Sequence, residues 1–431
     1  MSDASNALLT PATDPRERIA SIDVLRGVAV LGILSINIWF FAFPFDVASN
    51  PTIWGDYYGA DQIAWWTSWI AVEGSQRAIF TMLFGASALL FTDRLASDER
   101  RSNLTTIYYR RTGWLIVFGL VNGYILLWNG DILFFYGVMG LLLYFARGWS
   151  VRRLITVALI VIVLLDLFKL AGMLAQGYYG PIAEVAHEKV ERGESLIAEE
   201  QAAIDIMAAM PIETTTYEEL KSTVETRRAG YASAFALNAE ETTYYYLVFG
   251  LVSLFWESLA YMMLGMALFR LRWFDASRAT GLYVSMIVIG FAIGLAVNAW
   301  EQFDSIQHDY RSTFTYGTYD IGRMAMSFGF IGLIMLICKM AWLPRFRNML
   351  SAVGKMALTN YITQSVICNV IFIGFGLFGQ LRFHEIYYVV FAIWVAQLIV
   401  SPLWLKSYRY GPLEWLWRRL TYGQPVRLRL P

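Results

Sequence analysis

The chain of 431 residues contains only two cysteines and three histidines, and its 34 basic and 34 acidic residues cancel to a formal net charge of zero. Cys338 and Cys368 both lie inside apolar stretches, so we expect neither a disulfide nor a cysteine metal site. The balanced charge gives no indication of a nucleic-acid partner. The sequence has no metal-ligand spacing, nucleophile elbow or phosphate-binding glycine loop. No common catalytic motif therefore names an activity.

Apolar residues are abundant, at 57% of the chain, and they fall in long blocks instead of alternating. A helix needs about 20 consecutive apolar residues to cross a bilayer. We therefore predict an all-α polytopic membrane protein, with the lipid bilayer as its main partner and residues 1–431 as one integral membrane domain. Ten transmembrane helices are predicted, at 22–45, 62–91, 112–128, 131–147, 154–175, 244–269, 280–299, 320–341, 356–379 and 385–405.

The third and fourth predicted spans are separated only by Trp128-Asn129-Gly130-Asp131, which is typical of a tight external turn. Residues 1–18 lack the short apolar core of a cleavable signal, so we expect the first span to be retained as an anchor. Basic residues concentrate in alternate connections, and the short connections on the opposite side hold only Arg311 and Arg382. This asymmetry predicts that both termini are cytoplasmic.

Residues 176–243 form a long, polar, acid-rich connection between the fifth and sixth spans. We predict an extracytoplasmic helical insertion, with one or two helices in Glu184–Met210 and another in Tyr217–Arg228 that is capped by Thr214-Thr215-Thr216. The insertion is either a solvated helical hairpin over the outer face or a lid over a substrate.

Polar side chains interrupt the first span at Asp23, Arg26 and Asn37. A charge at membrane depth is costly unless it is paired or faces a wet cavity. Asp23 and Arg26 are three residues apart and therefore share one helix face. We predict that both lie near the cytoplasmic surface and bind substrate.

Two further charged pairs lie inside predicted spans. Glu73 and Arg77 are four apart, so their side chains are expected to share a face and to pair. The pair either fixes helix packing, or it leaves Arg77 facing a cavity where it binds an anion, with Glu73 orienting it. Asp166 and Lys169 are three apart, have no other polar neighbours in sequence, and are predicted to be a packing pair.

Glu257 is a lone acid in the sixth span, so it must find a donor or become neutral. It could act as a general base or as a partner for Arg77 or Lys169. In the ninth span, Asn360 and Gln364 are four apart. They form either interhelical hydrogen bonds or one wall of a polar cavity.

The three histidines, His187, His308 and His384, are all predicted to be external. His308 is the most suggestive, because it lies among acidic residues at the outer end of the seventh span and imidazole is the usual acid or base at neutral pH. An exposed loop histidine beside acids is nevertheless more often inert.

Several ordered segments together resemble the YeiB-like family of bacterial inner-membrane proteins, whose conserved region is named as a domain of unknown function. The resemblance covers nearly the whole chain and implies a multi-pass protein of the bacterial inner membrane. The matching segments include Ile22-Asp23-Val24-Leu25-Arg26-Gly27, Phe80-Thr81-Met82-Leu83-Phe84-Gly85-Ala86, Gly130-Asp131-Ile132-Leu133, Lys355-Met356-Ala357-Leu358-Thr359-Asn360-Tyr361 and Gly411-Pro412-Leu413-Glu414-Trp415.

The opening segment is also similar to the first span of transmembrane acyltransferases, both those that O-acylate bacterial surface polysaccharides and the heparan-α-glucosaminide N-acetyltransferases. In the polysaccharide family an arginine is followed eleven positions later by a required histidine. Arg26 matches the arginine, and Asn37 stands where the histidine would be. The N-acetyltransferases resemble this chain in having asparagine there, but their catalytic histidine follows a little further on. Here no histidine occurs between Asn37 and His187.

The resemblance implies transfer of an acyl group from a cytoplasmic thioester, such as acyl-CoA, to an extracytoplasmic or lipid-linked acceptor. Arg26 would meet the donor phosphates. Asn37 could donate to an oxyanion but cannot act as a base, so the base would be Glu73, Glu257, Asp131 or an external group such as His308. The predicted catalytic residues are thus Asn37, Glu73 and Asp131, and the predicted substrate-binding residues are Asp23, Arg26, Arg77, Glu257, Asn360 and Gln364.

The alternative is a transporter or binding protein for a small anionic or polar metabolite. Carriers often contain internal repeats, and none is evident here. A lipid-binding or structural membrane component is a third interpretation. No cofactor or metal is predicted apart from acyl-CoA as a donor substrate, and a homodimer stays open.

Overall fold

The computed structural model describes residues 20–97, 103–209, 216–311 and 313–430, and within them the chain is all-α. Seven helical stretches of the described chain are long and apolar enough to cross a membrane, which is the mark of a multi-pass membrane protein. They are Ala20–Ala42, Val151–Glu191, Tyr231–Arg270, Thr280–Gln307, Phe314–Lys339, Ala357–Gly374 and Ile386–Ser407.

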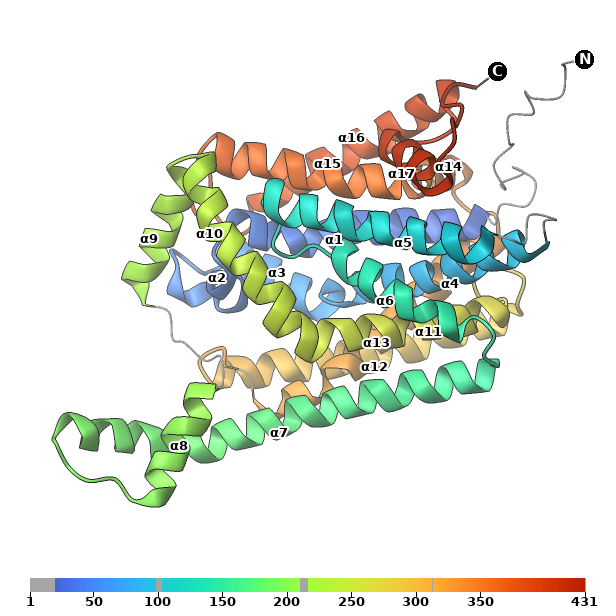
Figure 1. Ribbon diagram of the computed structural model, residues 1–431. Coiled ribbons are helices and arrows are strands. Elements are labelled where there is room, and N and C mark those ends of the chain that lie inside the picture. The colour runs from blue at the N-terminus through green and yellow to red at the C-terminus, as the bar shows by residue number, and fades with distance from the viewer. Residues whose placement is uncertain (1–19, 98–102, 210–215, 312, 431) are drawn as a thin grey trace, which may run out of the picture.

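The helices pack side by side along one common direction (Figure 1). The start of α1 lies with α14 and α17 at one end of the bundle, which we call the terminal end, whereas α8 and α9 lie at the opposite end, the insertion end (Figure 1). The α-helices are α1 (Ala20–Ala42), α2 (Phe45–Ser49), α3 (Ala60–Thr67), α4 (Ser75–Ser97), α5 (Leu104–Leu120), α6 (Leu133–Ala146), α7 (Val151–Glu191), α8 (Ala198–Ala209), α9 (Tyr217–Arg228), α10 (Tyr231–Tyr244), α11 (Phe255–Arg270), α12 (Thr280–Gln307), α13 (Tyr319–Lys339), α14 (Pro344–Lys355), α15 (Ala357–Asn369), α16 (Ile386–Ser407) and α17 (Pro412–Tyr422). Short 3-10 and π segments accompany them: η2 (Pro51–Ile53), η3 (Ser68–Val72), η5 (Val121–Ile125), η6 (Tyr245–Leu254), η7 (Phe314–Thr318) and η8 (Val370–Gly374).

The seven long stretches coincide with seven of the ten predicted spans, and the other three predicted spans are interrupted or short. The span predicted at 62–91 is broken, because η3 ends at an extended Glu73 and Gly74 takes a φ of +69° before α4 begins. The spans predicted at 112–128 and 131–147 correspond to α5 with η5 and to the 14-residue α6. Helices α4, α5 and α6 are therefore not identified as membrane-spanning by their length and apolarity alone.

The connection between η5 and α6 contains the predicted turn, at Asn129 and Gly130, and both of these residues are half-buried. Trp128 and Asp131 are both inaccessible to solvent, and the Trp128 indole donates to the Tyr361 hydroxyl at 3.0 Å. Asn129 donates to Glu241 of α10 at 2.8 Å. Trp128 and Asn129 thus hydrogen-bond to α15 and α10, and sequence composition could not indicate these partners.

The insertion begins and ends inside continuous helices. Helix α7 runs unbroken past the bundle, and α8 packs against its distal part (Figure 1). Residues 231–270 likewise form one continuous helical stretch through α10, η6 and α11. Helix α9 begins with a capping box between Thr216 and Glu219, which confirms the helix predicted at 217–228. Thr214, Thr215 and Met210 lie outside the described residues.

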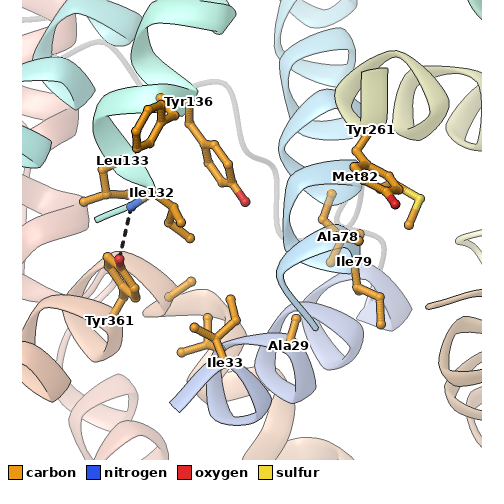
Figure 2. Close-up of a cluster of buried hydrophobic side chains, with 14 of the residues drawn as sticks. Ala29, Ile33, Ala78, Ile79, Met82, Ile132, Leu133, Tyr136, Tyr261 and Tyr361 are labelled. Carbon is orange, nitrogen blue, oxygen red and sulfur yellow. Dashed lines mark hydrogen bonds between the residues drawn. The ribbon is translucent and has the colours of Figure 1, made fainter. Parts of the chain in front are cut away.

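Apolar side chains from α1, α4, α6, α11 and α15 face one another in the centre of the bundle, as Figure 2 shows. Ile33 of α1 and Ile79 of α4 are buried there, with Tyr136 of α6. The Tyr361 hydroxyl of α15 accepts a hydrogen bond from the Ile132 backbone at 3.3 Å (Figure 2). A buried tyrosine needs a hydrogen-bond partner for its hydroxyl. Tyr361 finds that partner at Ile132, and the bond links α15 to the start of α6 through the core.

Helix α1 touches α14 backbone to backbone. A methyl group added at Gly27 would overlap the carbonyl oxygen of Leu350, and one added at Gly354 would overlap the carbonyl oxygen of Asp23. Small residues allow this approach, which is how membrane helices commonly associate. Gly27 belongs to a segment that carried the family resemblance, and Gly354 directly precedes another, so part of that resemblance reflects packing.

Replacing Gly27 with leucine is expected to lower the free energy of unfolding by about 1–3 kcal/mol or more, because overpacking forces α1 and α14 apart. The measurement is thermal unfolding of the purified protein in detergent. Gly172→Leu is the matched control, since nothing lies within 4 Å of the position where its side chain would begin. Equal losses of stability in the two variants would contradict the close contact.

Candidate functional site

Asp23 and Arg26 form the pair predicted for the first span. Arg26 Nη1 lies 2.9 Å from Asp23 Oδ1, and Arg26 Nη2 donates to Ser87 Oγ of α4 at 3.0 Å. Asp23 is buried and Arg26 is half-buried. The pair therefore joins α1 to α4 near the terminal end.

Asn37 lies eleven residues beyond Arg26, about three helical turns along the same face of α1. It is half-buried, and among the described residues its side-chain amide makes no hydrogen bond. The neighbouring Ser35 and Trp39 contact Tyr387 of α16, whose hydroxyl donates to the Ser35 carbonyl at 2.9 Å and accepts from the Trp39 indole at 2.9 Å. The Asn37 amide, without a hydrogen bond among the described residues, thus lies in a part of α1 that Tyr387 holds through Ser35 and Trp39.

Glu73 and Arg77 do not pair with each other, so the prediction that they share a helix face was wrong. The break at Gly74 separates Glu73 from α4 and changes the direction in which its side chain points. Glu73 instead accepts from Arg323 Nε at 2.8 Å and from the Tyr319 hydroxyl at 2.7 Å. Arg77 Nη2 lies 2.9 Å from Glu257 Oε1, which confirms Arg77 as a partner of Glu257.

Arg323 of α13 is enclosed by acceptors. Besides Glu73, its guanidinium donates to both carboxylate oxygens of Glu301, with Nη2 at 3.0 Å from Oε1, and to Asn298 Oδ1 at 3.3 Å. Its side chain is only 2% exposed. All three nitrogens donate, and four of the five N–H groups have a partner among the described residues, so these contacts give Arg323 a packing role.

The pair predicted between Asp166 and Lys169 is confirmed, with Lys169 Nζ at 3.5 Å from Asp166 Oδ1, and it is larger than expected. Lys169 also pairs with Asp320 of α13, whose other oxygen accepts from the Tyr261 hydroxyl at 3.2 Å. Lys169 therefore forms ion pairs with two carboxylates from different helices.

We call eight of these charged residues the ionic cluster. Arg77 differs from its other two cations, because its side chain is 23% exposed and, in the part of the chain described, it has one carboxylate partner. Lys169 and Arg323 each have two. Arg77 is thus the cluster residue best able to accept a further anion. The members of the ionic cluster are Glu73, Arg77, Asp166, Lys169, Glu257, Glu301, Asp320 and Arg323.

Asp131 is fully buried and caps a helix. Its carboxylate accepts from the Phe134 backbone at the start of α6 and from Asn122 Nδ2, both at 2.8 Å. The Tyr361 hydroxyl is 3.5 Å away. These contacts give Asp131 a structural role, and its predicted role as a base is not needed to explain its presence.

Asp131→Asn is expected to retain most of the stability, because the amide oxygen can still accept from Phe134, whereas Asp131→Ala should cost about 1–2 kcal/mol through loss of the cap. Chemical unfolding in detergent measures both. An Asp131→Asn variant that keeps its stability but loses enzymatic activity would instead favour a catalytic role for the Asp131 carboxylate.

Asn360 and Gln364 make hydrogen bonds between helices. Asn360 Nδ2 donates to Ser401 Oγ of α16 at 3.1 Å, and Gln364 Nε2 donates to Gln397 Oε1 at 3.0 Å. The Gln397 amide returns to the Asn360 carbonyl at 2.9 Å. Of the two predicted alternatives, interhelical hydrogen bonding is the one that these contacts confirm.

An aspartate and a histidine that sequence reasoning did not connect meet at the insertion end. Asp61, at the start of α3, is fully buried, and its Oδ1 lies 2.7 Å from His384 Nδ1 and accepts from the His384 backbone at 2.9 Å. Its Oδ2 accepts from Arg382 Nη2 at 2.6 Å and Nε at 3.0 Å. The His384 side chain is 29% exposed.

This dyad has the arrangement of a positioned base. A carboxylate that accepts from Nδ1–H fixes the imidazole tautomer and leaves Nε2 free to take a proton. Arg382 keeps Asp61 charged by pairing with its second oxygen. His308, which the sequence favoured, is 58% exposed, and its Nδ1 lies 2.8 Å from the carbonyl oxygen of Asp304 on its own helix.

The connection from η8 to α16, which carries His384, contacts both α1 and the insertion. Phe383, next to His384, stacks on Trp39 with ring centroids 5.3 Å apart. On the other side, Arg227 of α9 lies over the Phe378 ring, 5.2 Å from its centroid. In the sequence, this site was indicated only by Arg382, which is one of the two arginines in the short connections predicted on the outer side.

Comparisons with known proteins match the chain to a family and to relatives whose names state no activity. Residues 268–424 match the model of a family described as "Protein of unknown function (DUF418)". The chain is 29% identical to "Uncharacterized protein YeiB" of Escherichia coli (strain K12), over 94% of this chain and 96% of that protein. It is 26% identical to "Uncharacterized protein YxaH" of Bacillus subtilis (strain 168), over 95% and 96% respectively. No solved structure matches the chain.

Proposed function

Because the comparisons confirm that the chain is a YeiB-like protein with a DUF418 region, which names no reaction, we propose an activity from its own residues: acyl transfer from a cytoplasmic thioester such as acyl-CoA. The acceptor is a hydroxyl or amine at the insertion end. The protein crosses the bacterial inner membrane ten times, with both termini in the cytoplasm. The observation that carries the proposal is the His384–Asp61 dyad, since it supplies the base that the first span lacks.

In the proposed reaction, His384 Nε2 takes the proton of the acceptor as the acceptor oxygen or nitrogen attacks the thioester carbonyl. Asp61 stabilises the imidazolium that forms. The tetrahedral oxyanion receives a hydrogen bond from the Asn37 amide, which makes none among the described residues. Collapse of the intermediate breaks the C–S bond, and the departing thiolate takes the proton back from His384.

Donor binding is assigned to the same face of α1. Arg26 and Asn37 are about 16 Å apart along the helix axis, at 1.5 Å per residue. An extended thioester with its phosphates near Arg26 would bring its acyl group toward Asn37, and Arg26 keeps the partial exposure that this requires. Asp23 holds Arg26 in place.

The test uses purified protein in proteoliposomes that contain lipid and glycan extracts from bacterial envelopes, with labelled acetyl-CoA and longer acyl-CoA thioesters supplied outside. Protein-dependent release of the CoA thiol and labelling of a lipid or glycan are expected. Absence of both, for every thioester supplied, would overturn the proposal.

A second candidate, proton-coupled transport of a small anion, is favoured by the helix break at Gly74 beside the ionic cluster. Carriers use discontinuous helices near the membrane midplane. The cluster holds five carboxylates and three cations, so two carboxylates must carry protons for it to be neutral. In the same proteoliposomes, anion uptake driven by a pH gradient without any thioester would favour this function over acyl transfer.

A further inference from the structure

A cavity of about 850 Å³ opens at the terminal end of the bundle, away from the dyad and the ionic cluster. It lies between the start of α1, the end of α11 with the loop that follows, the end of α13, and α14. Its volume falls within the range of small-molecule sites. The polar side chains that line it include Arg270, Arg272, Asp275, Arg347, Asn348 and Ser351.

One of the three arginines in this wall is neutralised. Arg272 Nε lies 2.7 Å from Asp275 Oδ2, and Asp275 also accepts from Ser277. Burial raises the pKa of Asp275, but hydrogen bonds from Ser277 and Arg272 outweigh that effect and lower the pKa below its usual value. Asp275 is therefore ionised at neutral pH and balances Arg272.

The other two arginines have no carboxylate within ion-pair distance in the described residues. Arg270 donates to the backbone carbonyls of Trp149 and Arg147, the latter at 2.6 Å. Arg347 donates from Nη1 to the Cys338 carbonyl at 3.1 Å, and its Nε has no partner. Two guanidinium groups thus border the cavity without an ion pair among the described residues, and Asp93 acts on Arg270 only from a longer distance.

Helix α14 adds neutral hydrogen-bonding groups beside these charges. Ser351 follows Arg347 by four residues and Asn348 by three, so the three side chains share one face of α14. All three line the cavity. An amide, a hydroxyl and two guanidinium groups around one space are the groups that recognise phosphate oxygens.

We propose that this cavity binds a phosphate ester, with Arg347 and Arg270 supplying the charge and Asn348 and Ser351 supplying further hydrogen bonds. The phosphate belongs either to a soluble nucleotide or to an anionic lipid headgroup, because the cavity lies at the ends of the membrane-spanning helices. The site does not depend on acyl transfer, and it stands if no transfer is found.

The experiment measures binding by the full-length protein without turnover. Calorimetry in detergent with pyrophosphate and with CoA tests the soluble source. Thermal unfolding in nanodiscs of phosphatidylglycerol, compared with phosphatidylcholine, tests the lipid source. Binding of either soluble probe that weakens in Arg347→Gln, or a higher melting temperature in phosphatidylglycerol, is expected. No response to any of these probes would overturn the proposal.

Arg347→Gln tests the assignment, and Arg345→Gln is its charge-matched control on the same helix outside the cavity wall. Loss of a charge-assisted hydrogen bond should weaken binding about tenfold or more in Arg347→Gln and leave Arg345→Gln unchanged. Equal weakening in both would show attraction to the basic surface only and would refute the site. If Arg347→Gln does not fold, Ser351→Leu, which fills the cavity, should abolish binding.

Discussion

Replacing His384 with alanine is expected to lower the rate of acyl transfer about 10²–10⁴-fold, which is the usual contribution of a positioned general base. The imidazole is partly exposed and held by a buried carboxylate 2.7 Å from Nδ1, so its loss removes the proton acceptor without emptying the core. The measurement is kcat and KM for thiol release from acyl-CoA in proteoliposomes. A fall in kcat with little change in KM is the expected signature.

A structural role for His384 would be to fasten the loop at 382–384 to α3, and His384→Asn separates this role from catalysis. Asparagine can still donate to Asp61 but has no second nitrogen to act as a base. It should therefore be as inactive as His384→Ala while unfolding at the wild-type temperature. His308→Ala is the control for an exposed histidine and should keep full activity. An active His384→Asn variant would remove His384 from the mechanism.

Replacing Arg323 with leucine is expected to destabilise the protein by about 3–5 kcal/mol, because it leaves the half-buried carboxylate of Glu73 and the buried carboxylate of Glu301 without their cation. A loss of this size is a large share of the stability of a typical protein, so the variant should accumulate poorly in the membrane. The measurements are the amount of protein in the membrane and unfolding in detergent.

The matched variant combines Arg323→Leu with Glu73→Gln and Glu301→Gln. Removing the charges on both sides should recover most of the stability, since a buried ion pair contributes little net stabilisation beyond its neutral counterpart. Arg77→Gln should cost less than Arg323→Leu, because Arg77 is more exposed and has one carboxylate partner among the described residues. Failure of the triple variant to recover stability would mean that the geometry of the guanidinium, and not its charge, holds α12 and α13 to the second span.

The ion pairs that residue spacing alone predicted correctly are local and lie within unbroken helices. Asp23 with Arg26, and Asp166 with Lys169, are three residues apart in continuous helices, where the 3.6-residue period fixes which side chains meet. The same reasoning failed for Glu73 and Arg77, because a glycine with positive φ interrupts the period between them.

The sequence by itself determined that this is an all-α, multi-pass membrane protein, because the length and apolarity of each block depend only on neighbouring residues. It also supplied the polar residues to consider. Only the tertiary structure decided their partners: Asp61 and His384 are 323 positions apart, and Glu73 and Arg323 are 250 apart. Which helix faces meet depends on side-chain packing across the whole bundle, and the helical period within any one segment carries no information about it.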